Sequence, residues 1–240
     1  MGFLDFFGRK NSAGALAKHA KRAADKRAQN PDRWASILAL GEIKTPESAA
    51  ALLQRFTIRI DPSITDQEEK NLAMNGILAV GEGAVEPIRS FLKAGHSIAW
   101  PIKMLEKIVD TDALVTILLE LLEGMHTDYE RDPSRKVDLI AQLEERRDPR
   151  IADAVARFLE DVNETVRFHA AATLLAQEDC DAHREACMKL LAEDESVRVR
   201  VSVLDGFIAR GWGLGPTSGE LQSRLPPGYK ANEERVERIR

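Results

Sequence analysis

The feature that most constrains this chain of 240 residues is an internal repeat of about 30 residues. Residues 163–175 and 194–206 match in register, and the Val-Arg pairs at Val166-Arg167 and Val197-Arg198 lie 31 positions apart. The segments Leu38 to Glu42 and Leu78 to Glu82 also match each other, and each runs from a helical pattern into a Gly. Self-similarity at this period is typical of arrays in which each unit packs on its neighbours.

Each repeat predicts a pair of helices. The pairs Thr45-Pro46, Asp132-Pro133 and Asp148-Pro149 each place a capping side chain before a Pro at the first helical position. In four second helices the apolar positions follow the i, i+4, i+7, i+8 spacing of one helix face. Those positions are Ala84, Ile88, Phe91 and Leu92; Leu114, Leu118, Leu121 and Leu122; Ile151, Val155, Phe158 and Leu159; and His183, Cys187, Leu190 and Leu191. The predicted pairs span residues 31–56, 66–93, 97–123, 133–160, 164–192 and 195–225.

Composition supports helices and a soluble chain. The sequence has 31 Ala and 26 Leu against 13 aromatic residues, which favours helix over sheet. It has no uncharged apolar run of about 18 residues and no signal-peptide pattern. We therefore expect a cytoplasmic, all-α protein.

These repeats resemble HEAT repeats, and more narrowly the bacterial HEAT-like repeats named after phycobilisome lyases, over about residues 31–210. The resemblance implies a right-handed α-solenoid of about six helix pairs with one concave and one convex face. Residues 1–30 would then form a basic N-terminal segment, and residues 211–240 a short irregular C-terminal cap.

Two segments break the period. Residues 57–66 form an insertion, and the alternation of Phe56, Ile58 and Ile60 predicts an extended stretch there. In the tail we expect Trp212, Leu214 and Tyr229 to cover the open end of the last pair, and residues 236–239 to form a short strand.

Metal-ligating residue types cluster at one place only, at Cys180, His183 and Cys187. On a helix these positions share a face, so the three side chains could converge on zinc. The repeat alignment instead places His183 and Cys187 at core positions, where buried packing is the default for Cys. We therefore predict no metal, no cofactor and no catalytic residues.

The recurring Arg167 and Arg198 have two interpretations. They could form a basic ladder for an anionic partner, or each could pair with an acidic side chain or a helix-end carbonyl of the neighbouring repeat. Their recurrence in register favours the second interpretation, because stacking itself demands repeated contacts.

Trp100 raises the question of nucleic-acid chemistry, since HEAT-like glycosylases use a concave-face Trp with an acidic residue. Here Lys103 and Met104 follow Trp100 at helical spacing, so the acidic partner is missing, and Pro101 should lie in a first helical turn or kink the helix. Residues 31–240 carry 27 basic and 37 acidic side chains, and this negative balance also disfavours the binding of a polyanionic partner such as a nucleic acid. We expect no nucleic-acid partner.

The first thirty residues differ from the rest, with seven basic and two acidic side chains. Phe3, Leu4, Phe6 and Phe7 precede the basic stretch, a combination found in interfacial membrane anchors. The same residues could instead cap the first repeat or form a basic tail, so lipid or partner docking through them stays an open alternative.

Together these features predict a non-catalytic scaffold that binds a protein partner through a concave, largely acidic surface. One alternative is a phycobilin-lyase-like enzyme that binds a tetrapyrrole, which the resemblance alone implies. A third is peripheral membrane recruitment through residues 1–30.

Overall fold

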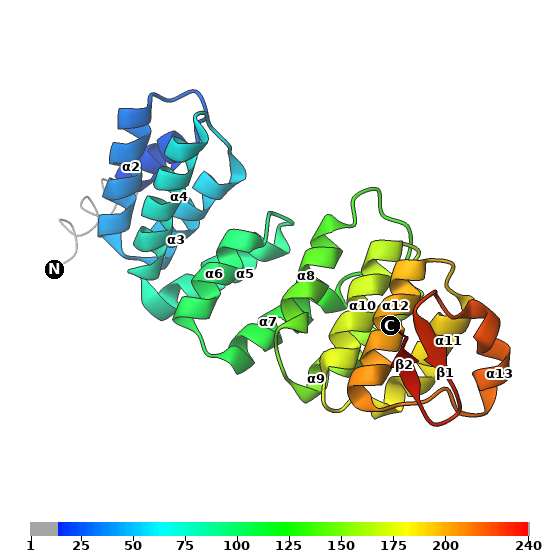
Figure 1. The fold of residues 1–240 in the computed structure, drawn as a ribbon. Coiled ribbons are helices and arrows are strands. Elements are labelled where there is room, and N and C mark those ends of the chain that lie inside the picture. Colours follow the sequence, from blue (N-terminus) through cyan, green and yellow to red (C-terminus); the bar gives the residue numbers. More distant parts are fainter. Residues whose placement is uncertain (1–13, 240) are drawn as a thin grey trace. The chain divides into compact units, whose positions relative to one another are not determined.

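The computed structural model describes residues 14–239, except for the side chains at 217, 218 and 220, and this part is helical apart from one two-stranded sheet (Figure 1). The predicted all-α class is therefore confirmed. The chain divides into two compact units, residues 1–114 and 115–240, and each is described by itself.

The first unit is built from stacked helix pairs. After a helical stretch over residues 14–23 come α2 (Asn30–Ile43) and α3 (Pro46–Leu53), which continues as a 3-10 turn over Gln54–Thr57. A second pair consists of α4 (Ser63–Leu78) and α5 (Val85–Lys93), joined by a 3-10 turn over Gly81–Ala84, and α6 (Ala99–Ile108) follows. First helices stack on first helices, because α4 packs against both α2 and α6, while α3 packs against α5.

The second unit repeats this arrangement. Its elements are α7 (Thr111–Glu123), which begins in the first unit, α8 (Ser134–Glu144), α9 (Pro149–Ala156) with a 3-10 turn over Arg157–Glu160, α10 (Glu164–Ala176), α11 (Arg184–Glu193) and α12 (Val197–Arg210). A 3-10 turn over Asp181–His183 precedes α11. Helix α10 packs between α8 and α12, as Figure 1 shows, and α11 packs against α12 and the 3-10 turn that extends α9.

The first five predicted helix pairs agree with the observed ones to within three residues at each outer bound, when the 3-10 continuations of α3 and α9 are included. The predicted sixth pair, 195–225, is wrong, because α12 is followed only by the four-residue α13 and short 3-10 turns. The predicted apolar positions of the second helices are all buried except His183, and they form the interior together with apolar side chains of the first helices. This agreement follows from the helical period, since one face of each second helix must be apolar to stack.

Helix starts follow the predicted capping signals. Thr45 forms a capping box with Ser48 at the start of α3, and the Asp148 carboxylate accepts a hydrogen bond from the Arg150 amide at the start of α9. At Asp132-Pro133 the prediction is one residue early, because α8 begins at Ser134 and Pro133 occupies the N-cap position.

The expected equivalence of Gly41 and Gly81 is wrong. Gly81 has φ +66° and follows α4, whereas Gly41 lies inside α2, whose C-cap is Lys44 at φ +53°. Gly41 instead faces Gly76 of α4, where an added Cβ would lie 3.0 Å from the Gly41 Cα. The two glycines therefore allow α2 and α4, the first helices of the first two pairs, to approach closely.

The insertion is shorter than predicted, because α4 begins at Ser63. Ile58 has an extended backbone (φ −115°, ψ 153°), as expected, and Ile60 is buried. The extended stretch does not include Phe56, which lies in the 3-10 turn Gln54–Thr57.

The tail packs against the second unit through α12, and the predicted short strand is observed as β2 (Val236–Arg238). It contains α13 (Ser218–Leu221), flanked by 3-10 turns over Gly215–Thr217 and Gln222–Arg224, and the antiparallel strands β1 (Tyr229–Ala231) and β2. Trp212 packs edge-to-face on Phe207 of α12 with ring centroids 5.2 Å apart, and Leu214 is buried. The Tyr229 hydroxyl donates to Asp205 of α12 at 2.6 Å.

Candidate protein-binding surface

A groove of about 600 Å³ lies between the second helices α9 and α11. Its apolar lining comes from Ala156, Leu159, Ala186 and Leu190. Five acidic and two basic side chains also line it: Glu160, Asp161, Glu193, Asp194 and Glu195, with Arg167 and Lys189. The groove therefore combines an apolar lining with an excess of negative charge.

Both basic side chains of this groove are already paired. Arg167 Nε lies 2.6 Å from the Asp194 carboxylate, and Lys189 Nζ lies 2.7 Å from that of Glu160. Within residues 14–239, the exposed carboxylates of Glu193 and Glu195 make neither an ion pair nor a hydrogen bond, so the excess charge is concentrated on them.

Another groove, of about 370 Å³, lies between α7 and α9. Leu119, Leu122 and Ala154 contribute apolar surface to it. Its Arg157 donates hydrogen bonds to the carbonyl oxygens of Leu122 and Glu123 at 2.7 and 3.2 Å, at the end of α7. Helix α9 thus forms a wall of both grooves.

The first unit has a comparable groove between its own second helices, α3 and α5. This groove measures about 460 Å³ and is lined by Leu53 and Phe91 together with the acidic Glu47 and Glu86. Grooves with apolar and acidic lining therefore recur between successive second helices in each unit.

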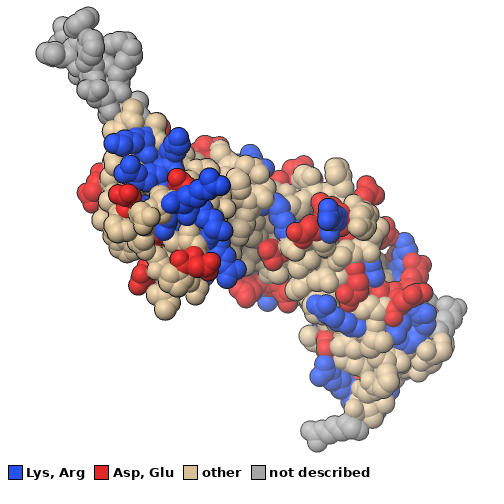
Figure 2. Space-filling model, turned by 90° about the horizontal axis from the view of Figure 1, so that it is seen from above, with Lys and Arg blue, Asp and Glu red and all other residues tan. Residues whose placement is uncertain are grey.

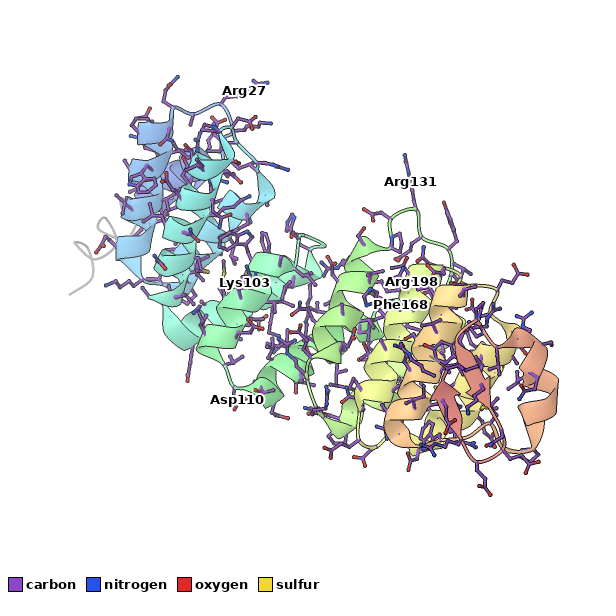
Figure 3. All side chains as sticks on the ribbon, viewed as in Figure 1. Arg27, Lys103, Asp110, Arg131, Phe168 and Arg198 are labelled. Atoms are coloured by element: carbon purple, nitrogen blue, oxygen red, sulfur yellow. The ribbon has the colours of Figure 1, made fainter. Side chains whose placement is uncertain are left out.

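The repeated arginines link neighbouring repeats, which confirms their predicted role. Arg167 pairs with Asp194, which precedes the next first helix, and Arg198 Nη1 lies 3.6 Å from the Glu164 carboxylate of the preceding one. The Arg198 guanidinium also stacks on Phe168, 3.8 Å from the ring centroid, and Figure 3 shows the two side chains together. These arginines hold the stack together and do not form a basic ladder.

The three metal candidates occupy different environments. Cys180 and Cys187 are buried free thiols, and burial raises the pKa of Cys187 to about 12, which opposes the thiolate that metals require. His183 Nε2 lies 2.8 Å from the Asp153 carboxylate. Across the described range, no three His, Cys, Asp or Glu side chains are arranged to hold a metal ion.

The predicted core position of His183 is wrong. The residue lies in the 3-10 turn before α11 and is only partly buried. Because α11 begins one residue later, the helical period used in the alignment does not extend to this position.

Trp100 serves packing in the first unit. Its ring centroid lies 5.3 Å from that of Phe56, and Lys103 Nζ lies 5.6 Å from the Trp100 ring centroid. Pro101 occupies the first turn of α6, as expected.

The N-terminal candidates Phe3, Leu4, Phe6 and Phe7 lie outside the described residues. Beyond them Lys18, Lys21, Lys26 and Arg27 are exposed, and in Figure 2 Lys and Arg side chains gather on the visible face of the first unit. None of the helices between residues 14 and 239 has the length and apolar content needed to cross a bilayer.

Sequence reasoning missed a buried charge cluster in the first unit. The Glu69 carboxylate is fully buried and accepts hydrogen bonds from Arg33 at 2.7 and 2.9 Å and from Arg55 Nε at 2.7 Å. Arg55, also fully buried, bonds Asp66 at 2.8 Å, and Asp66 accepts from the Ile60 amide at 3.2 Å. The cluster therefore anchors the insertion to the interior.

A second buried pair joins Lys136 of α8 to Asp161, with 2.7 Å between nitrogen and oxygen. In the buried pair and in the cluster around Glu69, one charged residue occupies a position at which the helical period of the sequence predicts an apolar side chain. Lys136 stands at apolar spacing with Leu139, Ile140 and Leu143, as Arg33 does with Ile37 and Leu40.

No protein-family model matches the chain, and no curated protein is significantly similar to it in sequence.

Proposed function

We propose that the chain is a non-catalytic scaffold of HEAT-like repeats that binds a protein partner through the grooves between its second helices. The proposed α-solenoid is supported by the stacking of first helices on first helices within each unit. It is also supported by the arginine contacts that recur between the last repeats. A stack of this kind gains stability from neighbour contacts and offers an extended surface.

The single observation that carries the proposal is the recurrence of grooves with an apolar lining and charged side chains between successive second helices. Protein interfaces combine a desolvated apolar centre with a polar rim, and these grooves supply both. Their excess of carboxylates agrees with the largely acidic binding surface that the sequence predicts.

A photo-crosslinking experiment in the producing cell tests the proposal. A benzophenone side chain replaces Ala186, which is exposed within the α9–α11 groove, or Asp138, which is exposed on the first helix α8. We expect a defined crosslinked protein from position 186 and not from position 138. That protein should also co-elute with the wild-type chain and not with Ala186→Trp. Equal crosslinking from both positions, or none from position 186, would contradict the proposal.

Peripheral membrane recruitment is a second proposal, supported by the exposed cations at Lys18, Lys21, Lys26 and Arg27. Flotation with phosphatidylserine-containing vesicles, and not with phosphatidylcholine alone, is the expected result. Flotation that survives deletion of residues 1–10 would remove their role as an anchor. The tetrapyrrole-binding alternative stays a prediction from the repeat resemblance.

A further inference from the structure

We propose that the α9–α11 groove binds a basic, amphipathic peptide segment of the partner protein. An apolar side chain of that segment would lie against Leu159 and Leu190, and its Lys or Arg side chains would pair with Glu193 and Glu195. This inference rests on the proposed function and adds the chemistry of the partner and the residues that recognise it.

Charge complementarity selects a basic occupant. Arg167 and Lys189 are the basic side chains of the groove, and each is held by a carboxylate at 2.6 to 2.7 Å. An acidic segment would have to separate those pairs and would face Glu193 and Glu195 as like charges. A basic segment leaves the pairs intact and neutralises the two remaining carboxylates.

The groove has short walls and room for several residues of a peptide. Ala156 and Ala186 keep the walls short on both sides, and Leu159 and Leu190 are almost fully buried. The volume of about 600 Å³ exceeds one side chain, so several residues of a peptide fit. Placing an amphipathic helix in such a groove is a common mode of peptide recognition.

Of the acidic side chains that line the groove, some stabilise the fold and others are available to bind the peptide. Asp194 is buried and belongs to the repeat-linking pair with Arg167, and Asp161 is held by Lys136. Glu193 and Glu195 lie outside those contacts, so they can be changed without breaking a buried ion pair.

Fluorescence anisotropy of the full chain tests the proposal with a labelled peptide built only of Lys and Leu, with Leu at i, i+3, i+4 and i+7. The double variant Glu193→Gln/Glu195→Gln should bind this peptide about tenfold more weakly, the combined effect of two exposed ion pairs. Ala186→Trp, which fills the groove, should abolish binding. The matched control Glu233→Gln/Glu234→Gln removes two exposed carboxylates from the C-terminal hairpin and should bind like wild type.

The outcomes separate this inference from the proposed function. Equal loss in the control and groove variants, or binding that survives Ala186→Trp, overturns the basic-peptide site. If the crosslinked partner is lost with Ala186→Trp but kept with Glu193→Gln/Glu195→Gln, the scaffold function stands and the inference fails. A wild-type dimer that Ala186→Trp dissociates would make a second copy the occupant and also overturn it.

Discussion

The buried charge cluster of the first unit and the α9–α11 groove of the second unit use carboxylates in opposite ways. At Glu69 one carboxylate is shared by two guanidinium groups in the interior, and each partner is held at hydrogen-bond distance. The carboxylates of Glu193 and Glu195 are exposed, and the basic side chains in the same groove are already paired with other carboxylates. We infer that the first set maintains the fold and that the second is available for binding.

This difference follows from the energetics of charge burial. A buried charge that loses its partner keeps its desolvation penalty, whereas an exposed carboxylate is solvated with or without a partner. Substitutions in the cluster should therefore change stability, and substitutions at the groove rim should change binding.

The largest expected effect is that of Glu69→Gln. It leaves the guanidinium groups of Arg33 and Arg55 buried without their shared anion, which should lower the free energy of unfolding by about 3–5 kcal/mol. Urea denaturation measures this loss. Glu68→Gln, at the exposed neighbouring position, should stay within about 0.5 kcal/mol of wild type. A loss below about 1 kcal/mol for Glu69→Gln would contradict the inference that this cluster maintains the fold.

A smaller effect separates the two repeated arginines of the second unit. Arg167→Gln leaves the buried Asp194 without its charged partner and should cost about 1–3 kcal/mol. Arg198 is half-exposed and its contact with Glu164 is longer, at 3.6 Å, so Arg198→Gln should cost under about 1 kcal/mol. Paired urea titrations measure both, and equal costs would show that register, not burial, sets the value of these contacts.

The smallest expected effect is a dependence of stability on acid through Asp66. Burial opposes ionisation of this carboxyl, but hydrogen bonds from Lys70, Arg55 and the Ile60 amide outweigh it and hold its pKa below the ordinary value. A lowered folded pKa contributes stability above the ordinary value of about 3.9, and the contribution is lost as pH falls through that value toward the lowered pKa. Urea midpoints between pH 6 and pH 3 should therefore fall less steeply for Asp66→Asn than for wild type. An unchanged slope would contradict this role.

The first five helix pairs, two of the three Pro-marked helix starts and the pairing of Arg167 could be predicted, because each leaves a periodic or local signal. The cluster around Glu69 could not, since a charged residue at an apolar position is interpreted as a break in the pattern until its partners are known. Its members lie on α2, on the 3-10 turn after α3 and on α4, so only the packed structure brings them together. The excess negative charge of the groove also depends on pairing, because Glu160 forms an ion pair with Lys189, whereas Glu193 and Glu195 form none within residues 14–239.

The most direct test of the account is thermal unfolding of the wild-type chain and Glu193→Gln/Glu195→Gln, each with and without the Lys/Leu peptide. A ligand that binds the folded state raises Tm, so the peptide should stabilise the wild type. We predict that the double variant has the wild-type Tm without peptide and a much smaller rise in Tm with it. A lowered Tm without peptide would show that these carboxylates maintain the fold, and an equal rise in both proteins would show that they do not bind the peptide.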